Sequence, residues 1–563
     1  MQRDPRKLDE LRSGRSELEN HVIDEFVSGY ISRREFFRRG SIIGLSIPML
    51  GAIASACGGA NSTGGSSGAS SAPSVAAKPG ASLKIASVVP TGTIDPRQVF
   101  DEGGLTMVQQ SAENLVFNNP HTNVLEPVLA TKWSSNPAGD VWTFTLRQGV
   151  TFNNGQPMTA DDVVYSFQSQ TNPNVYVNAA SAFTGVITNK GVKKVDDQTI
   201  AFHLEAPNGN FPYLISSDNY NMVIVPKGTD FTKWEKTFVG TGPFMIKSYQ
   251  PKVSASFTPN PNYWGGKVYP AGLDFIFYAT QQPQILALQA GNVDIVNLIV
   301  PQGAEAVLND PKYRLLVTKS SQHRELSMRC DQAPWTDKRV RQAMALSLNR
   351  PGIIAALFKQ YAQLGNDSPF APIFRSTDPT VPQRHQDITK AKQLLSDAGH
   401  PNGFTTDLYA EIYQEIPQYA QIIKQAAAGI GININLTVES QSKYYGNATF
   451  GKSDWLDGQM SLVDYGHRGV PNVFLGAPLM SDGAWNAAHF KNPTYDNLVK
   501  QYVGALDLSS QRKYAGEIQR LLLDETPLIL AYWFDAISVT KATVGGVVTT
   551  GMGQIYLNKA GLT

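Results

Sequence analysis

Residues 142–155 read WTFTLRQGVTFNNG, and this stretch decides the fold class. Apolar and polar side chains alternate from Trp142 to Leu146, which is typical of a β-strand with one buried face. The NNG that ends the stretch favours a turn, because Asn and Gly tolerate a left-handed backbone. Residues 159–162 read TADD and resemble a capping box before an apolar run at helical spacing. A strand, a turn and a helix in this order favour a mixed α/β fold.

The same two periodicities continue along the rest of the chain. Alternating or continuously apolar runs predict strands at 83–89, 199–204, 273–278, 432–438 and 528–534. Helical spacing predicts helices through 340–348, 391–398, 417–428 and 511–523. Gly399 and Pro401 follow the second of these helices, as helix-ending residues should. The body from residue 82 to residue 563 is too long for one simple core, so we expect two or three lobes.

Charge and cysteine content exclude several classes of protein. The formal net charge is +1 and no basic stripe is present, which argues against nucleic acid as a partner. Only two cysteines occur, Cys57 and Cys330, so a disulfide framework and a cysteine-based zinc site are excluded. His467 and His489 are too few and wrongly spaced for a metal cage. We expect neither a metal nor a cofactor.

The first 81 residues carry the signals of an exported protein. Residues 32–37 read SRREFF and resemble a twin-arginine export signal through Arg33 and Arg34. The apolar run that follows is shorter than the about 20 residues that span a bilayer, and it ends in ASACGG at 54–59. This ending resembles a lipoprotein cleavage box with Cys57 as the lipidated N-terminus; ordinary signal cleavage at the same bond is the alternative. The Gly/Ser-rich segment 58–81 is expected to be a flexible linker.

Eight segments, taken in order, resemble a known family. They are LATKW at 129–133, the stretch 142–155, MTADDVVYSF at 158–167, GTGPF at 240–244, NPNYW at 260–264, AGNVDI at 290–295, RQAMALSLNR at 341–350 and AKQLLSDAG at 391–399. Together they resemble the extracytoplasmic solute-binding proteins of peptide and nickel importers, known as family 5. The resemblance implies a three-lobed α/β fold of the periplasmic-binding-protein type, in which two hinged lobes close on a ligand beside an extra lobe.

The resemblance also implies a division of the chain into regions. The N-terminal regions would be the signal 1–57 and the linker 58–81. A discontinuous lobe I would comprise 82–117, 240–335 and 531–563. Lobe II would be 118–239, and lobe III would be 336–530.

The function implied by the resemblance is capture of a solute outside the cytoplasmic membrane. The chain would be the substrate-binding component of an ABC importer for a peptide or another amine-bearing solute. Its partners would be the transporter permease subunits and, through a lipid anchor, the membrane. We expect a monomer in the periplasm or at the outer face of the cytoplasmic membrane. Two alternatives stay open: a binding protein for an oligosaccharide or a metal complex, and a ligand sensor that presents to a membrane receptor.

Asp464 is the first candidate binding residue. It matches the position at which peptide-binding relatives place an Asp that pairs with the α-amino group of the ligand. A carboxylate in a closed cleft needs a cationic partner, because an unpaired buried charge is costly. The alternatives are a salt bridge to Arg468 and a loop cap. Ser461 stands where relatives commonly carry a Trp, and this departure puts ordinary peptide specificity in doubt.

Six further residues are candidates for ligand contact. Tyr465, His467 and Arg468 depart from the residues usual in relatives and would add aromatic surface and positive charge. Trp485 and Asn486 match a loop that faces the cleft in relatives, where they would stack on and hydrogen-bond a ligand, although a lone Trp, here as at Trp455, is more often a core residue. Arg329 follows a predicted strand into lobe III and could hold a carboxylate in a bidentate manner.

The sequence offers little support for an enzyme. Residues 446–453 read GNATFGKS and satisfy the phosphate-loop formula, but a polar stretch precedes them where that formula requires a buried strand. We interpret this match as coincidental. The body from residue 82 to residue 563 contains neither the G-x-S-x-G elbow of the α/β-hydrolases nor a His-Glu-x-x-His zinc helix. A binding protein is therefore the favoured interpretation.

Overall fold

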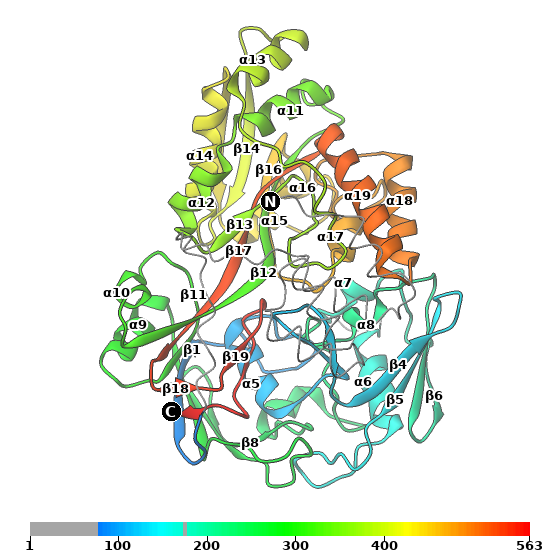
Figure 1. The fold of residues 1–563 in the computed structure, drawn as a ribbon, viewed down its shortest axis with the longest axis vertical. Coiled ribbons are helices and arrows are strands. Elements are labelled where there is room, and N and C mark those ends of the chain that lie inside the picture. Colours follow the sequence, from blue (N-terminus) through cyan, green and yellow to red (C-terminus); the bar gives the residue numbers. More distant parts are fainter. Residues whose placement is uncertain (1–76, 173–176) are drawn as a thin grey trace, which may run out of the picture. The chain divides into compact units, whose positions relative to one another are not determined.

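One large mixed sheet organises the fold. The structure is a computed structural model that describes residues 77–172 and 177–563, and Figure 1 shows its ribbon. The predicted signal, Cys57 and residues 58–76 of the predicted linker lie outside the described residues. The sheet runs in the order β15-β14-β16-β12-β17-β11-β1-β10-β9-β8, and β13 also pairs with β17. The bounds are β15 Ile432–Glu439, β14 Phe404–Glu411, β16 Met460–Tyr465, β12 Tyr313–Met328, β17 Leu528–Lys541, β11 Ile295–Ile299, β1 Ser82–Val88, β10 Gly272–Tyr278, β9 Ser254–Pro259, β8 Phe244–Gln250 and β13 Ala362–Leu364.

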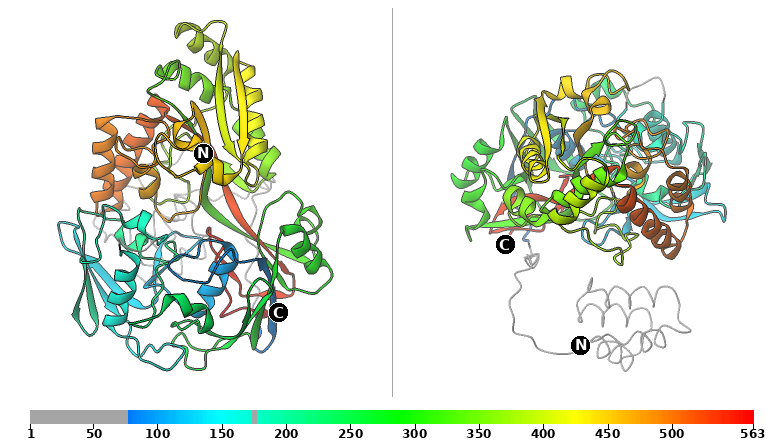
Figure 2. Two further views of the ribbon diagram at one scale, coloured as in Figure 1. Left: turned by 180° about the vertical axis from the view of Figure 1, so that it is seen from behind. Right: turned by 90° about the horizontal axis from the view of Figure 1, so that it is seen from above.

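Two long strands join the halves of this sheet. β12 has 16 residues and β17 has 14, and they pair antiparallel from Tyr313 opposite Lys541 to Ser327 opposite Leu528. In the sheet, β12 and β17 lie side by side between β16 and β11 (Figures 1 and 2). At about 3.3 Å per residue, such strands are long enough to cross two lobes. The sequence predicted β17 only as far as Phe534, so its second half was missed.

A second, four-stranded antiparallel sheet contains the stretch that opened the sequence analysis. Its order is β4-β5-β7-β6, with β4 Ala130–Ser135, β5 Val141–Leu146, β7 Thr199–His203 and β6 Val192–Asp196. Trp142, Phe144 and Leu146 are buried, as their alternation predicted. Helix α6, Ala160–Gln170, begins with the predicted capping box of Thr159 and Asp162.

Helices cover both faces of the β14–β16 half of the large sheet. The predicted helices are confirmed as α11 Lys338–Ser347, α13 Ile388–Asp397, α14 Ile416–Ala428 and α19 Leu508–Glu525. Residues of α11, α12 (Arg350–Phe358), α13 and α14 share one apolar core with this sheet. A second apolar core contains residues of α15 Gln441–Tyr445, α16 Asp454–Asp457, α17 Asn472–Gly476, α18 Pro493–Gly504 and α19.

The remaining elements complete the other half of the structure. Helices α5 Glu102–Ser111 and α9 Gln281–Gln289 contact β1. The short elements are β2 Val116–Asn118, β3 Leu125–Pro127, α7 Ala180–Phe183, α8 Phe211–Leu214, a 3-10 helix Phe231–Lys236, α10 Glu305–Leu308, β18 Val544–Gly545, β19 Val548–Thr549, β20 Ile555–Tyr556 and β21 Gly561–Leu562.

Buried apolar residues gather in separate clusters. One cluster around β1, β9 and β10 draws on both ends of the described chain, from Leu83 to Ala560. Another is built around β5 and β7. Residues from Val223 to Phe238, which the sequence analysis assigned to lobe II, pack in the cluster around β1. The lobe boundaries themselves stay a prediction.

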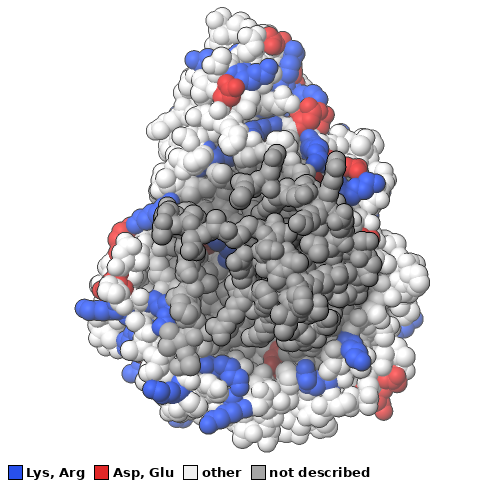
Figure 3. Space-filling view, viewed as in Figure 1, with Lys and Arg blue, Asp and Glu red and all other residues white. Residues whose placement is uncertain are grey.

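Acidic and basic side chains lie next to one another on the described surface around α11 and α13 in Figure 3, in keeping with the near-zero net charge.

Candidate functional site

Asp464 lies one residue before the end of β16 and is half-buried. The strand pairs antiparallel with β12, which sets Asp464 opposite Arg324. The Oδ1 atom of Asp464 accepts a hydrogen bond of 2.9 Å from the Tyr445 hydroxyl. No ion pair among residues 77–172 and 177–563 includes Asp464. Its carboxylate therefore has a hydrogen-bond donor but no directly bound cation in the described part of the chain.

The proposed salt bridge between Asp464 and Arg468 is wrong. The Arg468 guanidinium turns away along its own loop, where Nη1 donates to the carbonyl oxygen of His467 at 2.8 Å. The backbone N–H of Arg468 donates to the Ser321 hydroxyl, also at 2.8 Å. The loop geometry that follows β16 thus keeps Arg468 away from Asp464.

Glu411 places a second carboxyl beside Asp464. It is the last residue of β14, the strand next to β16, and its side chain is excluded from solvent. Its Oε1 accepts from the Tyr445 hydroxyl at 2.7 Å, and its Oε2 accepts from the amide of Gln441 at 2.6 Å. Burial raises the pKa of Glu411 to about 7, and the negative charge of Asp464 adds to this rise. Near neutral pH, Glu411 is therefore poised between its neutral and charged forms.

Arg324 is the buried cation of this region, and another carboxylate already engages it. Its Nε lies 2.9 Å from Oε1 of Glu415, and its Nη2 donates to Glu415 Oε2 at 3.1 Å and to Gln414 Oε1 at 2.8 Å. Burial alone would lower the pKa of Arg324, but the charges of Glu415 and Asp464 outweigh it and raise the pKa above its ordinary value. The cluster holds three carboxyl groups, of Glu411, Glu415 and Asp464, against this one guanidinium. With all four ionised, an excess of negative charge remains at Asp464.

Aromatic rings adjoin the carboxyl pair. The Tyr465 and Trp485 rings stack with their centroids 6.1 Å apart. The Trp455 ring lies 6.5 Å from Trp485 and 5.2 Å from Tyr445, which in turn contacts Asp464. Trp485 is half-buried, whereas Trp455 is almost fully buried in the core. Asp464 and Tyr465 are consecutive on β16, so their side chains point to opposite faces of the sheet. Tyr465 is buried against Trp485, and the aromatic residue that contacts the Asp464 carboxylate is Tyr445.

Two predicted residues lie elsewhere and have protein partners. Asn486 is buried, and its side chain donates to the carbonyl of Phe490 at 2.7 Å and accepts from the N–H of Phe490 at 2.9 Å. Arg329 forms a bidentate ion pair with Asp331, at 2.7 Å and 2.9 Å. These contacts order the local chain, and the ligand roles of Asn486 and Arg329 stay predictions.

His467 connects the loop after β16 to other parts of the molecule. Its Nδ1 accepts from the backbone N–H of Ser321 at 3.0 Å, so Nδ1 carries no proton there. The protonated Nε2 then faces Asp218 Oδ1 at 3.7 Å. Asn123 donates to the carbonyl of Gly469 at 3.0 Å. The segment that carries Asp464 into the loop is therefore held against residues of the predicted lobe II.

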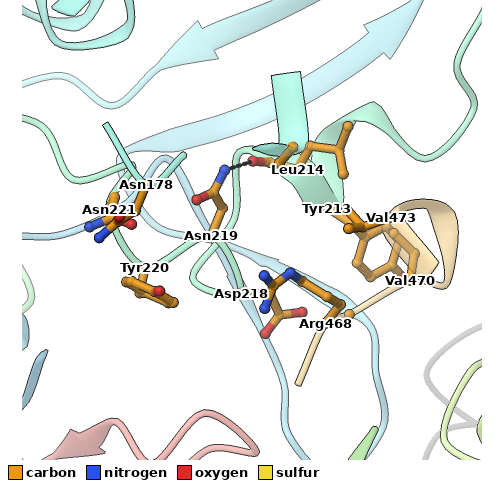
Figure 4. A pocket seen from close by; sticks show the side chains of 12 residues that line it. Asn178, Tyr213, Leu214, Asp218, Asn219, Tyr220, Asn221, Arg468, Val470 and Val473 are labelled. Atoms are coloured by element: carbon orange, nitrogen blue, oxygen red, sulfur yellow. Dashed lines mark hydrogen bonds between the residues drawn. The ribbon is translucent and has the colours of Figure 1, made fainter. Parts of the chain in front are cut away.

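A small pocket, partly open to solvent, lies at this junction (Figure 4). Asp218 and Arg468 lie close together in it. Its walls come from two distant parts of the chain, residues 178–221 and residues 468–473. Arg468 thus lines a pocket, and the lining of this pocket does not include Asp464 or Glu411.

The phosphate-loop match has the wrong structural context. Residues 446–453 run from α15, a helix of five residues, to α16, a helix of four residues. A phosphate loop needs a strand before it and a long helix after it. In the described part of the chain, moreover, no three His, Cys, Asp or Glu side chains gather in a way that could hold a metal ion.

Sequence reasoning missed Arg324, Glu411 and Tyr445. One signal was available: residues 323–325 read HRE within the apolar pattern of a strand, and such charged residues need partners when a strand is central. Glu411 and Tyr445 carry no comparable signal in the sequence. Their contact with Asp464 depends on β14 lying beside β16.

Comparison with known proteins identifies the class. Residues 124–478 match the family described as bacterial extracellular solute-binding proteins, family 5. Heme-binding protein A of Haemophilus influenzae is 29% identical over 457 residues, covering 75% of this chain and 81% of that protein. Di/tripeptide-binding protein 2 of Pseudomonas aeruginosa is 26% identical over 453 residues, covering 74% and 83%.

A solved structure supports the same conclusion for the fold. HbpA2 from Haemophilus parasuis superposes with a TM-score of 0.74 at 22% identity, covering 86% of this chain and all of that one. The chain belongs to family 5 of the bacterial extracellular solute-binding proteins. It has the predicted α/β fold of the periplasmic-binding-protein type. Its role is to bind a solute, as in this family of extracytoplasmic binding proteins. In the described residues, none of the helices meets the length and apolarity that a membrane span requires.

Proposed function

We propose that this chain is the substrate-binding component of an ATP-driven importer and that it captures a solute with a free amino group. Membership of the solute-binding family supports the first part of the proposal. The name of the Pseudomonas aeruginosa relative, a di/tripeptide-binding protein, supports a solute of peptide-like chemistry. The permease subunits of the importer would then be its protein partners.

One observation supports an amino group as the part of the solute that is recognised. Asp464 presents a half-buried carboxylate beside Glu411 and aromatic rings, with no ion-pair partner among the described residues. The nearby cation, Arg324, is bound to Glu415. Taking a carboxylate out of water is unfavourable unless a positive charge compensates it. An ammonium group of a solute would supply that charge.

Capture would proceed by hinged closure of the predicted lobes. Lobe I would comprise 82–117, 240–335 and 531–563, with lobe II at 118–239 and lobe III at 336–530. The predicted boundary between lobes I and III near residue 335 comes after β12, and the one near residue 530 lies at the start of β17. These two long, paired strands would therefore guide the hinge. Contacts between the predicted lobes II and III support a closed arrangement: the N–H of Gly209 donates to the carbonyl of Val503 at 2.8 Å, and Asn210 donates to Asn472 at 2.8 Å.

Export and anchoring complete the proposal. Arg33 and Arg34 would direct export by the twin-arginine route, and Cys57 would carry the lipid anchor after signal cleavage. The linker 58–81 would let a monomeric body move near the membrane. Globomycin-type inhibition of lipoprotein processing, followed by membrane fractionation, tests this part: a Cys57→Ser variant should leave the membrane fraction.

Thermal unfolding of the full chain tests the choice of solute. The panel contains di- to pentapeptides, opine-like conjugates, oligosaccharides, nickel complexes, heme and magnesium-ATP. A ligand at about a hundred times its dissociation constant stabilises the folded state by roughly 2.7 kcal/mol. We expect a rise in Tm with amine-bearing compounds in the wild type and in the control Asp482→Asn, an exposed position, but not in Asp464→Asn. A rise with sugars, heme or nickel complexes alone would overturn the amine assignment.

A further inference from the structure

The hydroxyl of Tyr445 contacts two carboxyl groups at once. Its oxygen lies 2.7 Å from Glu411 Oε1 and 2.9 Å from Asp464 Oδ1. A phenol has one proton and can donate it to only one of these acceptors. The second contact is favourable only if a carboxyl carries a proton and donates it back. The geometry therefore holds one extra proton among the three groups when no other cation is present.

Glu411 is the group that holds this proton. Its side chain is excluded from solvent, whereas that of Asp464 is half-buried, so ionisation is more costly at Glu411. Burial and the neighbouring charge raise the pKa of Glu411 to about 7. Burial and the two carboxylates also raise the pKa of Tyr445 above its ordinary value, so the phenol keeps its own proton.

The charged neighbours leave Glu411 without a cation of its own. Glu439 stands opposite Glu411 on β15 and pairs with Lys443. Arg324 pairs with Glu415. The other titratable groups that face the pair from the packed elements are the phenols of Tyr413, Tyr444 and Tyr465. Within the described residues, then, no protein ammonium or guanidinium group forms an ion pair with either carboxyl.

We propose that Glu411 is a positioning residue that couples capture of a cationic solute group at Asp464 to release of one proton. The inference rests on the proposed function and names the substrate class more closely: the solute carries an ammonium or guanidinium group, not a neutral amide. When that cation lies beside Asp464, the Glu411 proton leaves to water. Tyr445 then donates to the Glu411 carboxylate, and Asp464 turns its charge to the solute. One positive charge enters and one leaves.

Calorimetry with a defined probe tests the coupling. The dipeptide Ala-Phe is titrated into the full chain at pH 6 and pH 7, in two buffers of different ionisation enthalpy. The wild type should release about one proton per dipeptide at pH 6, and its affinity should rise about fivefold more than that of Glu411→Gln between the two pH values. The amino group of the probe titrates near pH 8, equally in both proteins, so the difference between them reports Glu411.

Matched variants separate this role from a structural one. Gln at position 411 keeps the shape of the neutral carboxyl, and it should keep Ala-Phe binding while it loses proton release. Glu113→Gln is the control, because burial also raises the pKa of Glu113 to about 7 but its partners are Tyr263 and Trp264; it should release protons like the wild type. Infrared difference spectra of the ligand-free protein between pH 6 and pH 8 should show a stronger protonated-carboxyl band in the wild type than in Glu411→Gln, because Glu102 and Glu113 contribute equally to both.

The outcomes distinguish the two claims. Equal proton release by the wild type and Glu411→Gln, with binding that Asp464→Asn abolishes, would overturn the coupling and leave the amine anchor intact. Binding of Ala-Phe that Asp464→Asn does not change would overturn the anchor, and the coupling with it. Failure of Ala-Phe and of every other cationic compound to bind would overturn both. Protonated-carboxyl bands of equal intensity in the wild type and Glu411→Gln would overturn the proton on Glu411 directly.

Discussion

Two carboxylates of the same half of the sheet, Asp367 and Asp464, differ in how their charge is compensated. Asp367 is fully buried and accepts from Arg350 at 2.7 and 2.8 Å, from Arg384 at 2.8 Å and from the N–H of Leu530 at 3.1 Å. Asp464 accepts from Tyr445, has another carboxyl, Glu411, as its neighbour, and forms no ion pair with any of the described residues. A carboxylate with two arginines stabilises the fold. One that lacks a cation is a place where a ligand can supply it.

The largest effect is expected at the compensated site. Asp367→Asn should lower the free energy of unfolding by about 3–5 kcal/mol, because it leaves Arg350 and Arg384 without their shared partner in the interior. Urea unfolding followed by circular dichroism measures this change. Asp464→Asn should lower the same free energy by less than about 1 kcal/mol, and a loss as large as that of Asp367→Asn would contradict the contrast between the two sites.

The next effect is on ligand binding. Asp464→Asn should weaken binding of an amine-bearing solute by about 2–5 kcal/mol, the usual loss when one partner of a desolvated charge pair is removed. Isothermal titration calorimetry gives the value. Asp482→Asn, an exposed aspartate, serves as the control. If the two variants bind equally well, the uncompensated carboxylate has no role in recognition.

The ligand-free protein should lose stability as the pH rises from about 5 to about 7. Burial raises the pKa of Glu411, Glu102 and Glu113 to about 7 each. Their ordinary pKa lies near 4.5, so the unfolded chain ionises first and the native state binds more protons in this window. The stability that these groups contribute is present in full below pH 4.5. As the pH rises above this value, each group lowers the free energy of unfolding by at most about 1.4 kcal/mol per pH unit.

Chemical denaturation at several pH values tests this dependence. Replacing Glu113 by Gln should flatten the decline while leaving the Asp464 region unchanged. A decline of the same slope in Glu113→Gln and Glu411→Gln as in the wild type would show that these carboxyls titrate normally in the native state.

The smallest effect concerns the bridge between the carboxyls. Tyr445→Phe removes hydrogen bonds to Glu411 and Asp464 but keeps the ring beside Trp455. We expect a loss of about 1 kcal/mol in binding free energy, because Asp464 loses its positioning contact. Calorimetric titration beside Tyr409→Phe, a half-buried tyrosine of β14, provides the comparison. An unchanged affinity in Tyr445→Phe would leave the hydroxyl without a role in binding.

Sequence periodicity accounts for the local structure but for only part of the site. Alternation placed β5 and its buried Trp142 and Phe144, and the capping box placed the start of α6. Tyr465 and Trp485 were associated with Asp464 through the family resemblance, and their rings do stack. Glu411 and Arg324 reach Asp464 only because β14 and β12 flank β16. That strand order depends on contacts between residues more than 50 positions apart, which local patterns do not encode.

The alternative ion pair between Asp464 and Arg468 does not form in the structure, because other contacts hold the loop after β16. Arg468 is four residues from Asp464 in sequence, and such proximity suggested an ion pair. The backbone N–H of Arg468 donates to the Ser321 hydroxyl, and the side-chain amide of Asn123 donates to the carbonyl of Gly469. Both bonds hold the loop against other parts of the chain. Arg468 therefore does not neutralise the charge of Asp464.

The most direct test of the central claim compares Ala-Phe with N-acetyl-Ala-Phe by calorimetry. Acetylation removes the positive charge and leaves the rest of the dipeptide unchanged. The account predicts that the wild type binds Ala-Phe at least about thirtyfold more tightly than its acetylated form, which corresponds to about 2 kcal/mol, and that Asp464→Asn loses this preference. Equal binding of the two compounds by the wild type would contradict the claim that Asp464 recognises a cation.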